Sequence, residues 1–596
     1  MGVSKEQNRM MGLDGLRAFA IIGVILFHLY PYDVVGGYVG VCLFFVLSGF
    51  LIGYRSFQQM SEMKFSLLSF YRKRILRIYP GLFFLVFVTC GGLFLLAPEV
   101  LGGKLGTIQS MFLGYNNWWQ ILKESSYFAR ISGQTPFLHI WSLAVEMQFY
   151  LVYPLFFYLF LWLVKRLRKR GALLILVLLT LFLAIYPANA YMNGMDAGRL
   201  YYGTDTRAFS FLMGICGGYF RVTKRQEERL HYRWLYVILF VLCFGASVCA
   251  CLWLDGSFAW TYIGGLQLMS AIFLIMILIA ADARLPIGRC LEVAPLRYLG
   301  SRSYEIYLWH YPVVFYLHYH KLMEKPLLIV AGMVVSLLLA EWTYQCNRIL
   351  FQRKFPSLPG KILFFVCSMG MILMTGLGII GVVRTPRTSS SGEAALRREL
   401  EDSSRAIEDQ QQAVQETVAQ ENVQEATSGY LDGTPVVDFN SVTLIGDSVM
   451  LSASEELTLL MPMAVVDAKE SRQMTDAVEI VNAMKENNTL GTTVVIALGT
   501  NGFFWEEDGQ ALIDAIGPQR NIFMVNVYGE HLEWQYRTNG TIRSLVRKND
   551  NVQMISWVKV VRANQGWLYE DGIHVEKEGQ QAYAQMIYDQ LNKFVK

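Results

Sequence analysis

Three residues near the C-terminus have the types and the spacing of a nucleophilic acyl-transfer site. Ser448 stands in GDSVML, where an expected strand ends and a helix begins, so its hydroxyl lies near free backbone N–H groups that suit a developing oxyanion. Asp571 and His574 stand three residues apart in DGIH. That spacing lets the carboxylate orient the imidazole while the other ring nitrogen reaches a serine. Taken alone, Ser448 is better explained as the N-cap of a helix.

The end of another expected strand changes this weighting. Asn501 stands in GTNG, and its side-chain amide can donate a hydrogen bond to an oxyanion. The GDS, GTN and DxxH motifs each follow an expected strand, in this order along the chain. Their combination favours catalysis over the N-cap interpretation.

A second set of ionisable residues lies within apolar sequence. Arg17 and His28 are separated by eleven positions in GLDGLRAFAIIGVILFH. On a helix they fall within about 20° of one face and lie about 16 Å apart along the axis, so we expect both to face one cavity. Ionisable groups at membrane depth are costly and usually functional. The structural alternatives are a topological anchor for Arg17 and a hydrogen-bonded bundle histidine for His28.

Five further residues are candidates for binding or transferring an acyl donor. Arg72 and Arg74, in FYRKRILRIYP, are predicted on the cytoplasmic side, where guanidinium groups can hold the phosphates of a nucleotide-type donor. His139 and Glu146, in LHIWSLAVEMQFYLVYP, are predicted near the outer face. His310, in YEIYLWHYP, is predicted inside a span. Membrane topology alone is the alternative explanation for the arginines.

The serine, asparagine and histidine motifs must be positioned by a sheet. From residue 439 onward, apolar β-branched runs alternate with helix-like segments, which predicts a doubly wound α/β domain over 439–596 with a parallel five-stranded sheet. Ligands of such sheets bind at the carboxyl ends of the strands, where the motifs stand. The five runs are SVTLIG (441–446), AVVDA (464–468), TTVVIALG (492–499), NIFMVNVYG (521–529) and NVQMISWV (551–558).

Residues 1–384 are predicted to form a polytopic α-helical membrane domain. Hydrophobic residues make up 54% of the chain and charged residues 17%, which argues against a simple soluble enzyme. We expect about eleven spans, each long enough to cross about 30 Å of hydrocarbon. The Lys/Arg bias of alternate loops places the N-terminus in the cytoplasm and the chain after about 385 outside the cell membrane. The spans centre on 13–31, 37–54, 79–97, 142–163, 172–189, 207–220, 234–252, 260–281, 301–319, 326–344 and 362–383.

Residues 385–438 are predicted to be an extracytoplasmic linker. The segment is rich in Glu, Gln, Ser and Ala, so we expect a tether that is partly helical at best. Weak heptad spacing at Ala406, Ile407 and Val414 leaves a short coiled coil open. Charge divides in the same way: net +18 before the linker, −7 within it and −7 after it.

The cysteines do not indicate a metal site. All nine lie in the first 367 residues, without a CxxC pattern, and the domain after the linker has none. That domain must be held together by its apolar core. We therefore predict no metal site. We also predict no bound cofactor and no nucleic-acid partner.

The C-terminal motifs resemble those of the SGNH hydrolase and transferase family. The resemblance implies that Ser448 is the nucleophile, His574 the base and Asp571 its partner. It also implies an oxyanion hole formed by the backbone N–H groups of Ser448 and Ser471 and by the side chain of Asn501. DAKESRQM departs from the family by presenting Ser471 where glycine is usual, so a side chain enters the site. The absence of GxSxG argues against the other common serine-hydrolase fold.

The N-terminal motifs resemble those of the acyltransferase family 3 membrane proteins. GLDGLRA, FFVLSGFLI, FYRKRxLRIYP, WSLAVExQFY and YLWHxP occur in the family order over most of the first 350 residues. The resemblance implies that Arg17 and His28 are essential for transfer and that Arg72 and Arg74 belong to the donor site. Cys42 departs from the family, which often has an acidic residue there.

The two parts together resemble bacterial cell-wall O-acetyltransferases, notably the peptidoglycan enzymes of Gram-positive organisms; VDAKxSRQ and ALGTNG support that branch. The resemblance implies a relay from cytoplasmic acetyl-CoA, with His28 handling the acetyl group and Ser448 accepting it. A glycan hydroxyl, at C6 of muramic acid, then attacks the acetyl-serine with His574 as general base. The expected partners are therefore acetyl-CoA, peptidoglycan and the lipid bilayer.

Other functions stay open at this point. The acceptor can be a teichoic acid, an exopolysaccharide or another surface polymer. A membrane-anchored esterase that removes acyl groups would use the same triad, because water and a sugar hydroxyl compete for one acyl-serine. A transporter with an appended binding module would show repeat symmetry, which the sequence lacks.

Overall fold

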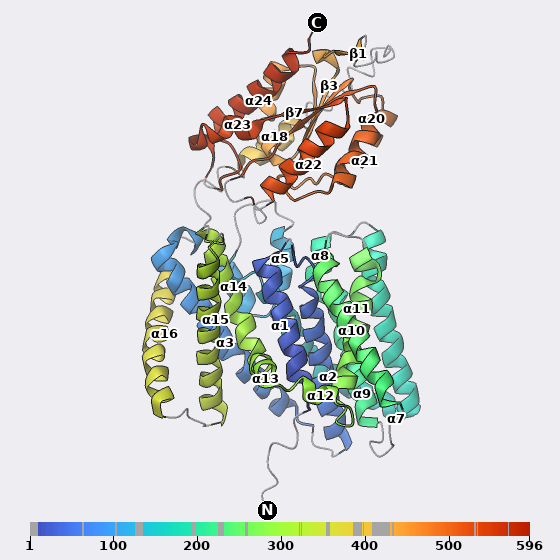
Figure 1. Ribbon diagram of the computed structural model, residues 1–596, viewed down its shortest axis with the longest axis vertical. Helices are drawn as coiled ribbons and strands as arrows, with labels where there is room; N and C mark the ends of the chain where they lie inside the picture. The colour runs from blue at the N-terminus through green and yellow to red at the C-terminus, as the bar shows by residue number, and fades with distance from the viewer. Residues whose placement is uncertain are drawn as a thin grey trace, which may run out of the picture. The chain divides into compact units, whose positions relative to one another are not determined.

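The chain folds into two compact units, which are described separately (Figure 1). The first contains Met1–Leu122 and Thr135–Arg387, and the second contains Thr388–Lys596. The computed structural model describes residues 10–595 apart from 32, 62–64, 102–103, 125–134, 194, 196, 224–231, 257–259, 321, 324, 353–357, 385–395, 397, 408–429, 432–433, 530–531, 533 and 570.

The first unit is a bundle of helices, and each of the eleven predicted spans coincides with helical structure. Among the described residues, seven helices are long and apolar enough to cross a membrane, so the chain is a membrane protein with the number of crossings still a prediction. The longer helices are α1 (Leu13–Leu29), α2 (Val39–Ser61), α3 (Leu67–Leu96), α7 (Ile140–Met192), α9 (Thr204–Thr223), α10 (Arg233–Trp253), α11 (Leu266–Ala280), α14 (Ser303–Tyr319), α15 (Pro326–Gln352) and α16 (Leu358–Arg384).

Shorter elements connect these helices. Helix α7 contains two predicted spans, separated where the backbone at Arg168 leaves the helical region (φ 61°, ψ 171°). The connecting elements are η2 (Pro98–Leu101), α4 (Leu105–Phe112), α5 (Asn116–Glu124), α8 (Ala197–Tyr202), η3 (Thr261–Gly265), α12 (Ile287–Cys290) and α13 (Ala294–Ser301).

Helices α2 and α9 pack with their backbones almost in contact. A Cβ atom added at Gly49 of α2 would lie 2.0 Å from the carbonyl oxygen of Phe211, and one added at Gly214 of α9 would lie 2.2 Å from that of Val46. Glycine is therefore required on both sides of this crossing. The contact packs α9 tightly against α2, although the span predicted there, 207–220, is the shortest of the eleven.

Helix α3 begins twelve residues before the predicted span at 79–97. Its first residue is Leu67, and Ser66 caps it by accepting the N–H of Ser69 at 3.4 Å. Arg72 and Arg74 therefore lie inside this helix and not in a loop between two spans. A run of four cations in six residues lowers the mean hydropathy of this part of the helix, so hydropathy alone does not reveal it.

The second unit contains the predicted parallel sheet of five strands, in the order β4-β3-β5-β6-β7. Alternate residues face opposite layers: Leu444 and Val495 pack in one apolar cluster, and Ile445 and Ile496 in another. Both faces are buried, which explains the continuous apolar runs. The strands are β3 (Val442–Gly446), β4 (Val465–Ala468), β5 (Thr493–Ala497), β6 (Asn521–Val525) and β7 (Val552–Ile555).

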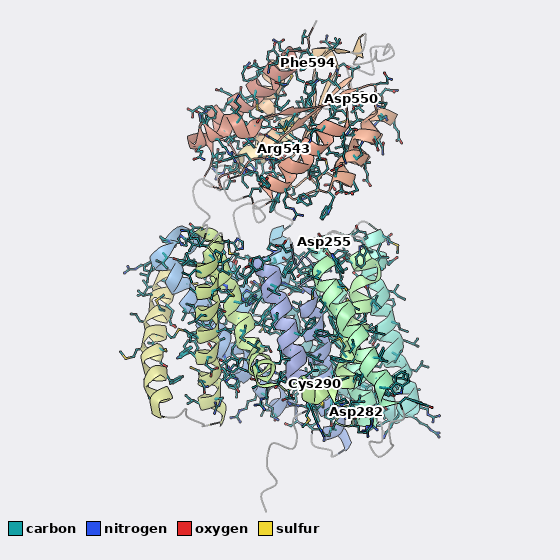
Figure 2. All side chains as sticks on the ribbon, viewed as in Figure 1. Asp255, Asp282, Cys290, Arg543, Asp550 and Phe594 are labelled. Atoms are coloured by element: carbon teal, nitrogen blue, oxygen red, sulfur yellow. The ribbon has the colours of Figure 1, made fainter. Side chains whose placement is uncertain are left out.

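Helices cover both faces of this sheet (Figure 1). Near the C-terminus, Phe594, labelled in Figure 2, packs with its ring centroid 5.7 Å from that of Phe523 in β6. The helices are α18 (Ser448–Ser452), α19 (Ser454–Leu460), α20 (Asp476–Glu486), α21 (Glu506–Ile516), α22 (Gln535–Lys548), α23 (Trp557–Arg562) and α24 (Lys577–Asn592), with single turns η4 (Phe439–Ser441) and η5 (Gln565–Trp567) and a small hairpin of β1 (Tyr430–Leu431) and β2 (Thr434–Pro435).

Part of the predicted linker belongs to the core of the second unit. Residues 398–407 are helical, and Leu396, Leu400 and Ile407 are buried in the same cluster as Leu444 of the sheet. Ile407 is therefore not available for a coiled coil, and Val414 lies outside the described residues. The segment is a docked helix here, whereas its polar composition predicted a tether.

Candidate active site

Ser448, His574 and Asp571 form a hydrogen-bonded chain at the carboxyl edge of the sheet. The hydroxyl oxygen of Ser448 lies 3.0 Å from Nε2 of His574. Nδ1 of the same ring lies 2.5 Å from Oδ2 of Asp571. This is the geometry of a nucleophile, a general base and a carboxylate that orients the base. The structure thus brings together the three residues that the GDS and DxxH motifs singled out.

Ser448 is the first residue of α18, directly after β3. The N-cap is Asp447, whose Oδ1 accepts the N–H of Val449 at 3.1 Å, so the serine hydroxyl is free to bond His574. The N-cap interpretation of Ser448 is therefore wrong. Burial raises the pKa of Asp447 to about 6, against hydrogen bonds from Val449 and Thr500 that favour its charged form.

A tight turn presents Asp571 and His574. Oδ1 of Asp571 accepts the backbone N–H groups of Ile573 and His574, each at 2.9 Å, and Gly572 has φ 68°, which glycine adopts without strain. Burial opposes ionisation of Asp571, but hydrogen bonds from the His574 side chain and from the two N–H groups hold its pKa below the ordinary value. The carboxylate is therefore charged and fixed in orientation at neutral pH.

The predicted oxyanion donors stand on the loops after β4 and β5. Ser471 has φ 60°, a conformation uncommon for a residue with a side chain and typical of strained functional loops. Nδ2 of Asn501 donates to the carbonyl of Arg472 over 3.4 Å, so the two loops lie together. This bond is long, and an oxyanion would compete well for the same amide group.

Arg472 was not identified from the sequence. Its side chain is 7% exposed; Nη1 donates to the Gly446 carbonyl at 3.1 Å, and the guanidinium also bonds the carbonyl and carboxylate of Asp467. Gly446 ends β3, two residues before Ser448. Arg472 therefore ties the Ser471 loop to the strand that carries the serine. A basic residue in DAKESRQM is the only signal the sequence held.

In the helical unit, Arg17 lies among other arginines. Nη1 of Arg17 bonds Oδ1 of Asp14 at 2.7 Å. Arg55 of α2 lies within electrostatic range of Arg17, Arg74 and Arg77. Four guanidinium groups from three helices thus share one region, which suits an anionic ligand. The sequence reasoning missed Arg55, which stands alone in FLIGYRSFQQ.

The two remaining cationic predictions differ in placement. The Arg74 guanidinium stacks 4.6 Å from the ring centroid of Tyr150 in α7 and 5.4 Å from that of Phe70. Arg72 is exposed, and no hydrogen bond or ion pair of it is found in the described part of the chain. The structure therefore places Arg74 beside the other arginines and leaves Arg72 on the outside of α3.

Glu146 lies beside Ser48 and Tyr150, not with His139. Its Oε1 accepts the hydroxyl of Ser48 at 2.5 Å and that of Tyr150. The carboxylate is within electrostatic range of Arg77, so Glu146 belongs to the arginine region and not to a separate group at the outer face. Glu305 of α14, which the sequence reasoning did not single out, also lies within range of Arg77.

Three histidines from three parts of the chain meet in the same bundle. Nε2 of His310 lies 3.1 Å from Nδ1 of His28, and the ring centroid of His139 lies 5.4 Å from that of His310. Tyr311 packs against His28 with ring centroids 4.8 Å apart. His28 therefore has an imidazole neighbour with which it can share a proton.

Cys42 lies beside a buried arginine. Its Sγ accepts Nη1 of Arg207 at 3.7 Å, and this guanidinium is 1% exposed and stacks on Trp141 and Tyr201. The thiol thus occupies the position where the family often has a carboxylate. Neutral sulfur gives that cation a weaker partner than a carboxylate would.

Comparison with known proteins places this architecture in a family. The model of the acyltransferase domain family matches residues 11–344, which is more than half of the chain. This chain belongs to acyltransferase family 3. An O-acetyltransferase OatA of Staphylococcus aureus is 30% identical over 588 residues, covering 97% of this chain and 95% of that protein. A peptidoglycan O-acetyltransferase OatA of Listeria monocytogenes is 27% identical over 624 residues, covering 98% of each.

A solved structure is also similar to part of this chain. It is the C-terminal catalytic domain of a Streptococcus pneumoniae peptidoglycan O-acetyltransferase A, carrying a methylsulfonyl adduct. The match is 25% identical and covers 26% of this chain and 91% of that one, with a TM-score of 0.24.

Proposed function

We propose that this acyltransferase is a transmembrane O-acetyltransferase that moves acetyl from cytoplasmic acetyl-CoA to peptidoglycan outside the cell, at the C6 hydroxyl of muramic acid. The observation that carries the proposal is the Ser448–His574–Asp571 chain of hydrogen bonds on a chain whose helical part belongs to acyltransferase family 3. The similarity over nearly the full length to a peptidoglycan O-acetyltransferase of Listeria monocytogenes supports this acceptor.

In the proposed outer half-reaction, Ser448 Oγ attacks the carbonyl carbon of an incoming acetyl group. His574 Nε2, at 3.0 Å, accepts the hydroxyl proton, and Asp571 stabilises the resulting imidazolium. The backbone N–H groups of Ser448 and Ser471 and the amide of Asn501 face the developing oxyanion. The bond between the acetyl group and its carrier then breaks, and His574 gives the proton to the departing carrier atom. A glycan hydroxyl next attacks the acetyl-serine and gives its proton to His574, which passes it to Ser448 Oγ as the serine ester bond breaks.

In the proposed inner half-reaction, the arginine region binds the phosphates of acetyl-CoA. Arg17, Arg55, Arg74 and Arg77 supply the positive charge, and His28 with its neighbour His310 handles the proton and the acetyl group. The loop cations support a cytoplasmic N-terminus and an extracellular second unit. This division suits the substrates, because CoA does not cross a bilayer and the polymer acceptor lies outside it.

The acceptor is tested by the O-acetyl content of purified peptidoglycan. Cells with the intact protein and cells with Ser448→Ala are compared by releasing acetate with mild base and by mass spectrometry of muropeptides. We expect muramic acid acetylation to be lost in Ser448→Ala. Unchanged acetylation would refute the acceptor. A gain of acetyl on peptidoglycan in Ser448→Ala would instead identify an esterase, and a loss from teichoic acid or exopolysaccharide alone would identify another polymer.

The relay is tested by loading of the serine. Full-length protein in membranes without a glycan acceptor is incubated with labelled acetyl-CoA and quenched in acid, and the peptide containing Ser448 is analysed for acetyl. We expect label on that peptide and none when His28→Ala is added. Normal loading in the His28→Ala background would exclude His28 from the pathway.

A further inference from the structure

The helix that follows the last membrane helix is docked on the second unit beside the catalytic turn. Residues 398–407 are helical, and three apolar side chains anchor the segment: Leu396 is 3% exposed, Leu400 is not exposed, and Ile407 is 6% exposed. Their cluster also contains Ile573 and Val575, on either side of His574. Hydrophobic burial therefore holds this helix against the turn that presents the imidazole.

The carboxylate of Glu399, on this helix, accepts hydrogen bonds from one residue before that turn and one residue after it. Oε2 of Glu399 accepts the hydroxyl of Tyr569 at 2.6 Å, and its Oε1 accepts Nε2 of Gln580. Gln580 is 2% exposed, at the start of α24. Both oxygens of a half-buried carboxylate are thus occupied by donors from the catalytic domain, an arrangement stronger than neutral hydrogen bonds.

The two donors lead directly to His574. The N–H of Tyr569 donates to the carbonyl of His574 at 2.8 Å, and Nε2 of Gln580 also donates to the carbonyl of Val575 at 3.1 Å. Glu399 is therefore linked to the backbone carbonyl of His574 through Tyr569 and to that of Val575 through Gln580. Burial and the hydrogen bond to Glu399 both raise the pKa of Tyr569, so this tyrosine stays a neutral donor at any working pH.

We propose that Glu399 is a positioning residue for the catalytic base: it holds the turn of Asp571 and His574 through Tyr569 and Gln580. The inference rests on the proposed acyl-serine chemistry of the second unit. It gives the segment between the membrane helices and the sheet a role in catalysis, since the chain that leaves α16 supplies a support of the triad. Ser448 stands on a separate element, at the start of α18, so a shift of the turn changes the distance from His574 to Ser448.

We expect loss of the Glu399 hydrogen bonds to lower kcat and to leave KM for a small ester substrate unchanged. Displacing a catalytic group by about 1 Å can cost about 10²-fold in rate, and a partial loosening costs less. We expect Glu399→Gln to lower kcat by about tenfold, because its amide group meets the amide of Gln580 and one of the two bonds is lost. KM for a small ester is expected to stay within twofold, because Glu399 does not touch substrate.

The experiment uses full-length protein in detergent micelles with p-nitrophenyl acetate as the acyl donor. A sulfonyl fluoride titrates the reactive serine, so kcat is expressed per titrated site. Asp402→Asn is the matched control: it makes the same chemical change on the same helix, at a carboxylate that is 77% exposed and 3.9 Å from Arg405. Tyr569→Phe removes the other hydrogen bond of Glu399, the one from the tyrosine hydroxyl, and serves if Glu399→Gln does not fold.

The inference predicts that Glu399→Gln and Tyr569→Phe each lower kcat per site. It is overturned if kcat per site of both variants equals that of Asp402→Asn while only the titratable fraction falls, since that result describes stability alone. Ser448→Ala separates the two proposals: persistent hydrolysis there contradicts the proposed function, whereas a flat response to Glu399→Gln contradicts this inference alone.

Discussion

Replacing Asp571 with asparagine tests how the base at the serine site is oriented. Oδ1 of Asp571 accepts two backbone N–H groups, from Ile573 and His574, at 2.9 Å each, whereas Oδ2 faces Nδ1 of His574 at 2.5 Å. In Asp571→Asn the two N–H donors require the carbonyl oxygen at the first position. The new NH2 group must therefore point at Nδ1 of the imidazole.

This forced orientation puts the imidazole in the wrong tautomer. Nδ1 must accept a hydrogen bond, so the ring proton moves to Nε2, the atom 3.0 Å from Ser448 Oγ that has to accept the hydroxyl proton. In the serine protease triad the same exchange lowers kcat by about 10⁴. That factor corresponds to about 5.5 kcal/mol of barrier at about 1.36 kcal/mol per tenfold. We expect a loss of this order here.

The variant also loses a pH-dependent part of its stability. Because the pKa of Asp571 is held below its ordinary value in the folded protein, the interaction stabilises the fold above the unfolded pKa and is lost as pH falls through the folded value. Asp571→Asn should therefore unfold more easily than the parent protein at pH 7, and the difference should shrink in acid.

The assay is hydrolysis of p-nitrophenyl acetate by full-length protein, normalised to folded protein by size-exclusion chromatography. Asp589→Asn is the control, because Asp589 is exposed on α24 and accepts a hydrogen bond from Gln585 of the same helix at 2.8 Å. If Asp571→Asn retains activity within tenfold of Asp589→Asn, the tautomer argument is refuted and His574 is not the base.

Three further predictions concern the oxyanion donor, a buried acid and the helix packing. Asn501→Ala should lower kcat for the same ester by about 10² to 10³ with little change in KM, as expected for a donor that acts on the oxyanion; a change in KM alone would contradict the assignment. The pKa of Asp447, raised to about 6, means that folding stability falls as pH rises from about 4 to 6, by at most about 3 kcal/mol, and Asp447→Asn should remove that slope from a series of thermal unfolding curves. Gly49→Ala should lower the yield and Tm of the folded membrane unit, because its Cβ would lie 2.0 Å from a backbone oxygen of α9, whereas Gly245→Ala, with nothing within 4 Å, should be neutral or stabilising; equal effects of the two would count against the packing argument.

The strands and the catalytic motifs could be predicted because their signals are local. The three central strands, β3, β5 and β6, are buried on both faces, so each forms a largely apolar run that is visible without a partner. Ser448, Asn501 and His574 follow such runs, and parallel strands bring their carboxyl ends to one edge. Motif order along the chain was therefore enough to predict which side chains meet.

The supports of the site could not be predicted in this way. Arg472 ties the Ser471 loop to β3 through the carbonyl group of Gly446, a group that every residue has, so no residue type in the sequence marks this partner. Arg55 of α2 joins the arginine region because the folded bundle brings it within electrostatic range of Arg74 and Arg77 of α3, not through spacing. Glu146 was expected near the outer face with His139, and its neighbours Ser48 and Arg77 were missed for the same reason: its position along α7 does not reveal which helix faces it.

The linker shows the same limit most clearly. Leu396, Leu400 and Ile407 are spaced four and seven apart, as on one helix face, but their few apolar side chains in a polar segment predicted a tether. These three side chains share an apolar cluster with Ile573 and Val575, which lie more than 160 residues further along the chain.

The sequence by itself determined the two-part architecture, the parallel sheet and which side chains meet at the carboxyl edge of that sheet, because hydropathy, strand period and turn motifs are properties of neighbouring residues. The tertiary structure alone decided which groups hold those side chains in place: Glu399 beside the catalytic turn, Arg472 beneath the Ser471 loop, and His310 against His28. These contacts join residues far apart in the chain, and their energy depends on distances of a few ångströms that form only when the chain packs.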